Sequence, residues 1–469
     1  MNFMWLDLSL MIVFVIGVAI FLITRKKNLK REGLLYLYRS EWGIKLIDKI
    51  GKKHKRLLKI LSHISVWLGY VLMIVMLWLV GRIIWIYLFN ADIVQAIKIP
   101  PITPLIPYLP QIFNLDFLPP FYFIYWIIII AIIAISHEFF HGIFAAFNKI
   151  KIKKTGFGFF PFFLPIFLAA FVEPDEKQMQ SKSNFAQRTV LSAGTFANIL
   201  TAIIGLFLVA GFFALSFAPT GIIFDDYAYN IAETSEITMI NNISLQNPTY
   251  EEISSLINLT GENEIIIDNE IYYSLRGSSA DGKYVALYYD SPAINAEIYG
   301  PIIRINNQEV SSLEEFSQEL NKYSVGQEIT ISTEINKQEI DYQIILQEKP
   351  GEPNSPWIGI SFFQQSTGVM AKIFLATSFY KDSHTFYSEK YQGAQFIYDL
   401  LWWLVLISFS VALVNMLPMG IFDGGRFFYL SILKLTRSEK IAKVSFKFMT
   451  YLLLFVVVLV MFYWAKSFF

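Results

Sequence analysis

Six separate stretches of apolar residues constrain the fold of this chain more than any other feature. A helix needs roughly 20 such residues to cross the hydrocarbon core of a bilayer. The hydrophobic share of the sequence, 55%, also exceeds that of an ordinary soluble domain. We therefore expect a polytopic α-helical membrane protein whose first helix is a retained anchor, because it lacks the cleavage site of a signal peptide. The predicted spanning helices are residues 4–24, 61–90, 121–147, 189–218, 397–417 and 448–465.

Charged residues set the expected orientation of these helices. Residues 25–60 contain thirteen Lys or Arg against three Asp or Glu, and an excess of Lys and Arg is typical of cytoplasmic loops. The region 221–370 has 23 Asp or Glu against 6 Lys or Arg, which favours a solvated module on the opposite side. We predict a multi-pass protein of the cell membrane, with loop 25–60 cytoplasmic, region 221–370 extracytoplasmic and both termini outside.

The outer region has alternating apolar residues at 327–335 and 340–346, which is typical of β-strands. Residues 291–307, followed by a helix-like segment at 312–320, resemble the bacterial-type PDZ domain. A weak internal echo is also present, since Ile237-Thr-Met-Ile-Asn-Asn recurs as Ile302-Ile-Arg-Ile-Asn-Asn. The echo fits two PDZ-like copies or one domain with an elaborated N-terminal half, and we favour the second.

An apolar segment, residues 156–171, is too short to span the membrane and contains Pro161 and Pro165. Proline removes a helical hydrogen bond, and non-helical backbone at membrane depth is tolerated only where protein buries it or where it lines a watery cavity. We expect a re-entrant strand or loop beside a site. An interfacial loop on the inner leaflet is the alternative.

The third apolar stretch contains His137-Glu-Phe-Phe-His141, the strongest local signal in the sequence. Residues four apart lie on one helical face, so both imidazoles can reach one zinc ion while Glu138 stands beside a bound water. The chain has no cysteine, so a metal must be held by His, Asp or Glu. Two buried, hydrogen-bonded histidines are the alternative, but ionisable groups inside a membrane helix usually mark a functional site.

A catalytic zinc site has three protein ligands and one open position, so a third ligand is needed. The fifth apolar stretch runs into Asn415-Met-Leu-Pro-Met-Gly-Ile-Phe-Asp423-Gly-Gly. A carboxylate such as that of Asp423 is a common type of zinc ligand, and the glycines after it allow close approach of the backbone. Pro418 and Gly420 should end the helix there. Taken alone, this segment also fits a simple helix-terminating turn.

The two motifs together, His-Glu-x-x-His and Asn-x-x-Pro-x-x-x-x-Asp-Gly, resemble the site-2 protease family of intramembrane zinc metalloproteases. The resemblance implies that His137, His141 and Asp423 bind zinc. It also implies that Glu138 is the catalytic general base and that Asn415 holds the substrate or the developing oxyanion.

Two further segments resemble this family. Residues 193–198 match its Gly-x-x-x-Asn element, although Thr195 stands where proline is more usual, and small residues there also suit helix packing. The acids Glu173, Asp175 and Glu176 resemble a segment of archaeal members, which also carry a PDZ-like insertion. The same acids could simply begin a solvated helix.

The resemblance implies a domain organisation and a function. Residues 1–120 would hold the N-terminal helices and basic loop, residues 121–219 and 371–469 the two parts of the catalytic core, and residues 220–370 the extracytoplasmic PDZ-like region. The implied activity is zinc-dependent cleavage of membrane-spanning proteins, as in regulated intramembrane proteolysis. We expect membrane-protein substrates and the lipid bilayer as partners, and no nucleic acid.

Three alternatives remain open at this point. One is a catalytically silent membrane scaffold that binds peptide ends through its PDZ-like domain. Another is a metal transporter, although such proteins tend to show internal repeats in the membrane part. The third is a prenyl-protein type of membrane protease, in which a downstream Glu would be the third ligand.

Overall fold

The structure is a computed structural model of the chain, and it forms two compact units, residues 1–211 with 395–469 and residues 212–394. We describe each unit by itself. The residues that the structure describes are 3–26, 29–32, 35–90, 105–115, 117–159, 168–257, 263–268, 270–279, 281–363, 372 and 376–466.

Within the described residues, six helices are long and apolar enough to cross a membrane, which confirms the predicted helical, polytopic architecture. Three of them begin five or more residues earlier than predicted, at Lys55, Asn184 and Glu439, because polar and charged residues continue the helix beyond its apolar part. The six are α1 (Phe3–Thr24), α3 (Lys55–Phe89), α6 (Phe123–Phe147), α8 (Asn184–Ser216), α13 (Ala394–Asn415) and α15 (Glu439–Lys466).

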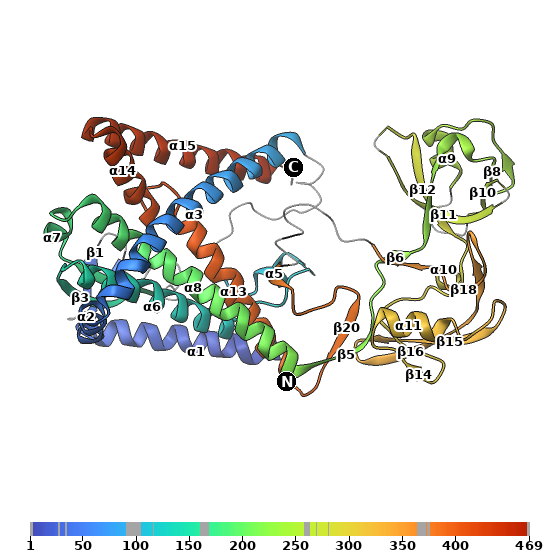
Figure 1. Ribbon diagram of the computed structural model, residues 1–469, viewed down its shortest axis with the longest axis horizontal. Helices are drawn as coiled ribbons and strands as arrows, with labels where there is room; N and C mark the ends of the chain where they lie inside the picture. The colour runs from blue at the N-terminus through green and yellow to red at the C-terminus, as the bar shows by residue number, and fades with distance from the viewer. Residues whose placement is uncertain are drawn as a thin grey trace. The chain divides into compact units, whose positions relative to one another are not determined.

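Short elements connect these helices at their two ends. The connections at one end contain α2 (Ile44–Lys53), α7 (Glu176–Gln180) and α14 (Asp423–Thr436), whereas α5 (Leu109–Ile112) lies at the other end (Figure 1). Each of the six long helices thus runs from one end of the unit to the other.

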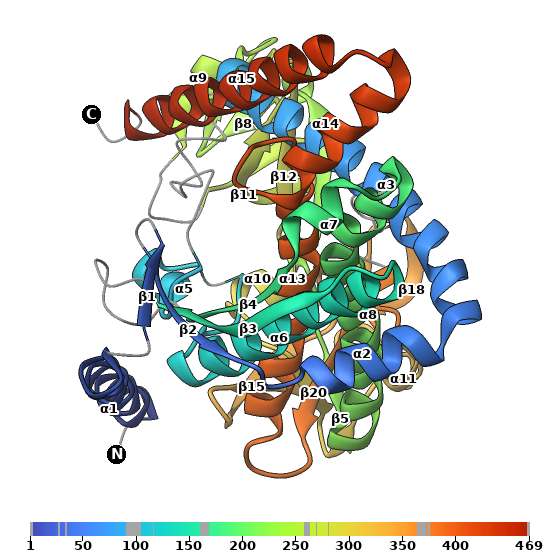
Figure 2. The ribbon, with the colours of Figure 1, turned by 90° about the vertical axis from the view of Figure 1, so that its left-hand side faces the viewer.

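A four-stranded antiparallel sheet covers α6 near its C-terminal end (Figure 2). Its order is β1-β2-β3-β4, so β4 is an edge strand. The predicted re-entrant segment contributes β3 and β4, while residues 160–167 between them lie outside the described residues, and its entry into the membrane stays a prediction. The strands are β1 (Leu29–Glu32), β2 (Leu35–Ser40), β3 (Ile152–Phe159) and β4 (Leu168–Pro174).

Helix α2 packs closely against α6 because glycines lie at the contact. A Cβ atom at Gly142 would lie 2.8 Å from Cδ1 of Ile47, and one at Gly51 would lie 2.7 Å from Cβ of Ala146. Ile47 is only 1% exposed and belongs to the main buried cluster of this unit, together with Phe144. These contacts hold the C-terminal half of α6 in place below the sheet.

The second unit contains two larger antiparallel sheets, each with its own buried apolar cluster. The first sheet has the order β7-β12-β11-β10-β8-β9 and packs against α9 (Tyr250–Leu256). Its strands are β7 (Tyr229–Glu233), β8 (Met239–Ile240), β9 (Ile243–Ser244), β10 (Ile265–Ile267), β11 (Glu270–Ser278) and β12 (Tyr284–Tyr289).

The second sheet has the order β16-β15-β13-β5-β20, with β14 paired to β13, and its cluster includes residues of α11 (Leu313–Leu320). Its strands are β5 (Phe217–Ile222), β13 (Ile302–Ile305), β14 (Gln308–Glu309), β15 (Glu328–Ile335), β16 (Gln338–Ile345) and β20 (Thr385–Glu389). The remaining elements are the strand pairs β6 (Asp226–Tyr227) with β19 (Ile360–Ser361) and β17 (Gln347–Lys349) with β18 (Glu352–Trp357), the helix α10 (Pro292–Asn295) and the 3₁₀ helix η2 (Thr234–Glu236).

The internal echo in the sequence corresponds to the same turn in both sheets. Asn241 donates its backbone N–H to Glu264 O over 2.9 Å, and its side-chain Oδ1 accepts from Glu264 N over 3.0 Å. Asn306 makes the matching pair of contacts with Thr330, at 2.7 and 2.8 Å. A capped helix follows each turn, with Thr249 and Ser312 as the capping residues. The two turns thus share one hydrogen-bonding pattern, while the choice between two PDZ-like copies and one elaborated domain stays a prediction.

Candidate metal centre

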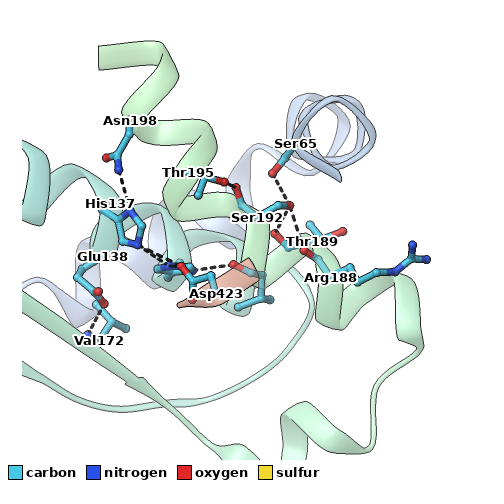
Figure 3. Close-up of polar contacts among 12 residues, drawn as sticks. Ser65, His137, Glu138, Val172, Arg188, Thr189, Ser192, Thr195, Asn198 and Asp423 are labelled. Carbon is cyan, nitrogen blue, oxygen red and sulfur yellow. Dashed lines mark hydrogen bonds and ion pairs between the residues drawn. The ribbon is translucent and has the colours of Figure 1, made fainter. Parts of the chain in front are cut away.

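The metal-binding motif lies near the C-terminal end of α6. His137 and His141 are one helical turn apart, so their rings face the same direction and their Nε2 atoms lie 3.0 Å from each other. Glu138 is directly beside them, and the three residues form a group whose ligand atoms lie within 4.8 Å of one another. The structure thus brings together the three residues that the motif predicted on α6, and Figure 3 shows two of them, His137 and Glu138, near Asp423.

Asp423 reaches this group from a break between two helices. Helix α13 ends at Asn415 and α14 begins at Asp423, as the intervening proline and glycine predicted. The chain can turn tightly here because Gly424 and Gly425 have no Cβ atom. A Cβ atom at Gly424 would lie 2.5 Å from the carbonyl oxygen of Met416, and one at Gly425 would lie 2.1 Å from that of Met419. Oδ2 of Asp423 lies 3.3 Å from Nε2 of His137 and 3.1 Å from Nε2 of His141.

The three atoms have the spacing that one metal ion requires. Zinc with ligand bonds of about 2.0–2.1 Å in tetrahedral geometry separates its ligand atoms by about 3.3 Å. The observed separations between the two Nε2 atoms and Oδ2 are 3.0, 3.1 and 3.3 Å. The side chains of His137, His141 and Asp423 are 12%, 14% and 25% exposed, so they are largely shielded from solvent. The donor set therefore fits zinc.

The second nitrogen of each imidazole, Nδ1, lies next to a hydrogen-bonding partner on α8. Nδ1 of His141 lies 2.6 Å from Val190 O, and a carbonyl can only accept, so Nδ1 carries the proton. Nδ1 of His137 lies 3.1 Å from the side-chain amide of Asn198. The buried Oδ1 atom of Asn198 makes no hydrogen bond among the described residues. Rotating the amide by half a turn would let Oδ1 accept a hydrogen bond from Nδ1–H of His137. Such contacts are typical of metal-binding histidines.

Helix α8 approaches the two imidazoles without a side chain in between. A Cβ atom at Gly194 would lie 2.4 Å from Nε2 of His137 and 2.5 Å from Nε2 of His141. Gly194 and Asn198 are the residues that matched the Gly-x-x-x-Asn element in the sequence, and both now have a role at the site. The hydroxyl of Thr195 donates a hydrogen bond of 2.8 Å to Ser192 O in the same helix.

Polar contacts fix α8 against its neighbours. The hydroxyl groups of Ser65 on α3 and Ser192 on α8 lie 2.8 Å apart, and both residues are buried. Arg188, also on α8, donates to the hydroxyl of Tyr70, which lies 2.9 Å from the hydroxyl of Ser431 on α14. The helix that supplies Val190 O, Gly194 and Asn198 is thereby tied to α14, which begins with Asp423.

Glu138 has a contact that the sequence did not predict. Its Oε2 accepts a hydrogen bond of 2.9 Å from the backbone N–H of Val172 on β4. Val172 pairs with Thr155 on the other side of the strand, so this N–H belongs to the unpaired edge of the sheet. The carboxylate next to the metal group is therefore held at the edge of β4. A backbone N–H has no sequence signature, which is why only the structure shows this contact.

Three acids at the end of β4 and the start of α7 make ion pairs with three different elements. Asp175 caps α7 by accepting from Gln178 N over 3.0 Å, so the prediction of a helix start is confirmed. The pKa of the Asp175 carboxyl is lowered, first by this backbone N–H and then by Lys153. The ion pairs are Glu173 with Arg39 on β2 at 3.2 Å, Asp175 with Lys153 on β3 at 3.3 Å, and Glu176 with Arg426 on α14 at 2.7 Å.

Asn415 is the last residue of α13 and is partly exposed. Within the described residues its side chain makes no hydrogen bond, so its amide is available to a ligand. The structure thus brings His137, His141 and Asp423 into direct contact and places Glu138 within 4.8 Å of the two histidines, while the function of Asn415 stays a prediction.

Comparison with known protein families gives one match that covers the site. The family model of peptidase family M50 matches residues 125–459, which is more than half of the chain and includes both motifs. No curated protein matches the chain.

Proposed function

Because the chain belongs to peptidase family M50, the site-2 protease family of membrane metalloproteases, we propose that it is a zinc-dependent endopeptidase that cleaves membrane-spanning proteins. One observation carries this proposal. Two imidazoles from α6 and the carboxylate of Asp423 converge at metal-ligand spacing, with Glu138 beside them at the edge of a sheet. A scaffold without catalytic activity would not need this arrangement.

Each side chain has a chemical role in this proposal. His137, His141 and Asp423 would hold a zinc ion, which when bound polarises a carbonyl group and lowers the pKa of water. Glu138 accepts the proton from the attacking water and then donates it to the leaving amine. The free amide of Asn415 binds the substrate backbone or the oxygen that becomes negative during the attack.

The edge of β4 supplies a way to hold the substrate. A peptide bond inside a helix is protected by its own hydrogen bonds, so the substrate must unwind before it is cleaved. An extended segment can add to the free edge of a sheet through main-chain hydrogen bonds. Substrate added to β4 would lie beside Glu138, because the N–H of Val172 on that edge already contacts this side chain.

A variant of Glu138 tests the proposed reaction. Glu138→Gln keeps the size of the side chain and all three zinc ligands, but an amide cannot accept the proton from water. We expect the purified variant to bind zinc like the wild type and to leave a model membrane helix uncleaved. Glu439→Gln is the matched control, since Glu439 is exposed at the start of α15, and it should cleave normally. Cleavage by the Glu138 variant, or no zinc in the wild type, would contradict the proposal.

We also propose that the end of the membrane unit with the metal centre faces the cytoplasm. The basic segment 25–60 contributes β1, β2 and α2 at this end. The chain has no cysteine, so single cysteines can report the orientation. Lys49→Cys should resist an impermeant thiol reagent applied to intact cells, whereas Asn307→Cys should react with it. The reverse labelling pattern would show the opposite orientation.

The outer unit would present or select substrates, because no His, Asp and Glu cluster with metal-ligand spacing occurs in its described residues. Ile222 and Thr385 are direct partners on β5 and β20, so an Asn-Gly turn can join them and replace the residues between. We expect this shortened chain to keep its zinc and to cleave a different range of substrates. Loss of zinc from the folded, shortened chain would show instead that the outer unit supplies a ligand.

A further inference from the structure

A small cavity lies next to the proposed general base, between α6 and the sheet. Ile135, Glu138 and Phe139 of α6 line one side of it, and Ala170 and Val172 of β4 line another. Ile47 of α2 also contributes, held close to α6 by its contact with Gly142. The cavity therefore touches both the carboxylate that would activate water and the strand edge that would bind the substrate backbone.

The surface that this cavity presents to a ligand is mainly apolar. The hydroxyl group of Thr155 donates to Trp42 O over 2.7 Å, and the hydroxyl of Ser40 lies 3.4 Å from that of Thr155. Oε2 of Glu138 accepts from Val172 N. With these polar groups already paired, the remaining surface comes mainly from aliphatic and aromatic side chains. A charged or strongly polar side chain would lose most of its hydration against this apolar surface, in which Glu138 is the only ionisable residue among those described.

The size of the cavity limits what it can accept. Its volume is about 50 Å³. A water molecule occupies about 30 Å³ in the liquid, so the cavity has room for one or two heavy atoms. A methyl or ethyl-sized side chain fits inside this space, whereas the side chains of Leu and Phe would extend beyond it.

We propose that this cavity binds a small apolar side chain of the substrate, on a residue next to the cleaved peptide bond. The inference rests on the proposed function and adds a substrate class to it, namely membrane helices with a small apolar residue beside the cleavage point. A substrate strand on β4 projects its alternate side chains toward the same face of the sheet, so one of them would enter the cavity beside Glu138. A helix that unwinds at a small residue also loses less side-chain packing than one that unwinds at a large residue.

The test compares substrates that differ at one position. Model membrane helices carry Gly, Ala, Val, Leu or Phe on either side of the cleaved bond, which is mapped by mass spectrometry. We expect the wild-type chain to prefer Ala over Leu at one of these positions by about 10-fold or more in kcat/KM, the range for rejecting extra methylene groups.

Two variants of the chain should shift this preference in opposite directions. Ile135→Ala enlarges the cavity and should reduce the preference for Ala over Leu by roughly 10-fold. The side chain of Ile135 is 42% exposed, so its truncation leaves the fold intact. Ala170→Val fills the cavity and should shift the preference from Ala to Gly. Ile132→Ala is the matched control, since Ile132 lies one turn earlier on α6, is 40% exposed and does not line the cavity.

Zinc content and cleavage of the Gly substrate are measured for every variant. An unchanged size preference in Ile135→Ala, with zinc and cleavage retained, would overturn the role of the cavity alone. A change of the same size in Ile132→Ala would also overturn it. Failure of the zinc-loaded wild type to cleave any of the substrates would overturn the proposed function itself, and the role of the cavity with it.

Discussion

The two ends of α6 each receive a carboxylate from another helix, but the carboxylates meet opposite kinds of partners. Asp7 of α1 is only 1% exposed and lies at the N-terminus of α6. It accepts hydrogen bonds from the hydroxyl of Tyr108 at 2.6 Å, from Phe123 N at 2.7 Å and from Ile124 N at 3.0 Å. Asp423, by contrast, faces the Nε2 atoms of two histidines, and Nδ1 of His141 already donates to Val190 O.

This difference distinguishes a structural carboxylate from a metal ligand. The first backbone N–H groups of a helix have no partner inside the helix, and an anion there is further stabilised by the helix dipole. Asp7 is therefore complete without any ligand. Among the described residues, Asp423 has no backbone donors of this kind and instead converges with two imidazole nitrogens at metal-ligand spacing, an arrangement that a bound cation would complete. The partners of a buried carboxylate, rather than its burial, thus indicate which residue is functional.

The largest effect is expected from Asp423→Asn. The substitution keeps the size of the side chain but replaces an anionic ligand with a weak neutral one, so the two histidines alone must hold zinc. We expect the purified variant to lose most of its zinc and to cleave more than about 100-fold more slowly than the wild type. Zinc analysis and a cleavage assay check this, and full zinc retention would show that Asp423 is not a ligand.

A smaller effect at the same end is expected from Gly194→Ala. The new methyl group would lie about 2.4 Å from the ring of His137, so one or both imidazoles must move. We expect zinc affinity to fall by about 10- to 100-fold, as when groups that orient metal ligands are changed. Gly211→Ala on the same helix is the control, because no atom lies within 4 Å of its new methyl group. Equal zinc affinities for the two variants would contradict the close approach of α8.

The smallest effect is expected from Asp7→Asn, which is the same exchange as at Asp423 but at the other end of α6. The variant loses a charged acceptor that serves three donors, so its free energy of unfolding should fall by about 1–3 kcal/mol. Zinc content should stay that of the wild type. Unfolding in detergent measures the first quantity, and Ser9→Ala on α1 provides a control with little expected change. Loss of zinc with unchanged stability would remove the distinction between the two carboxylates.

The sequence predicted most of the membrane unit and the centre of the site. The six helices were visible because membrane spans need long apolar stretches, and the metal group was visible because its chemistry requires particular side chains at fixed spacing. The contacts of Val172 N and Val190 O could not be predicted, because every residue except proline has the same backbone groups. The role of Asp7 was also hidden, since its partners come from distant segments of the chain.

The second unit, residues 212–394, was predicted less completely for a related reason. Alternating residues indicated strands, but the partner of each strand depends on turns and on packing that the pattern does not record. The echo around Asn241 and Asn306 was a weak sequence signal, because only the asparagine side chain is needed for the turn that the two sheets share.

The order in which the sheet and the metal centre can form has a consequence for synthesis in the cell. Ser40 of β2 meets Thr155 of β3 across 115 residues of chain, and His141 meets Asp423 across 282 residues. At about 5–20 residues per second, β2 waits roughly 6–23 s for its partner, and the histidines wait roughly 14–56 s for the aspartate. An unfinished chain therefore inserts its first helices with no assembled metal centre. Chain order alone thus keeps the three proposed metal ligands apart until Asp423 has been synthesised.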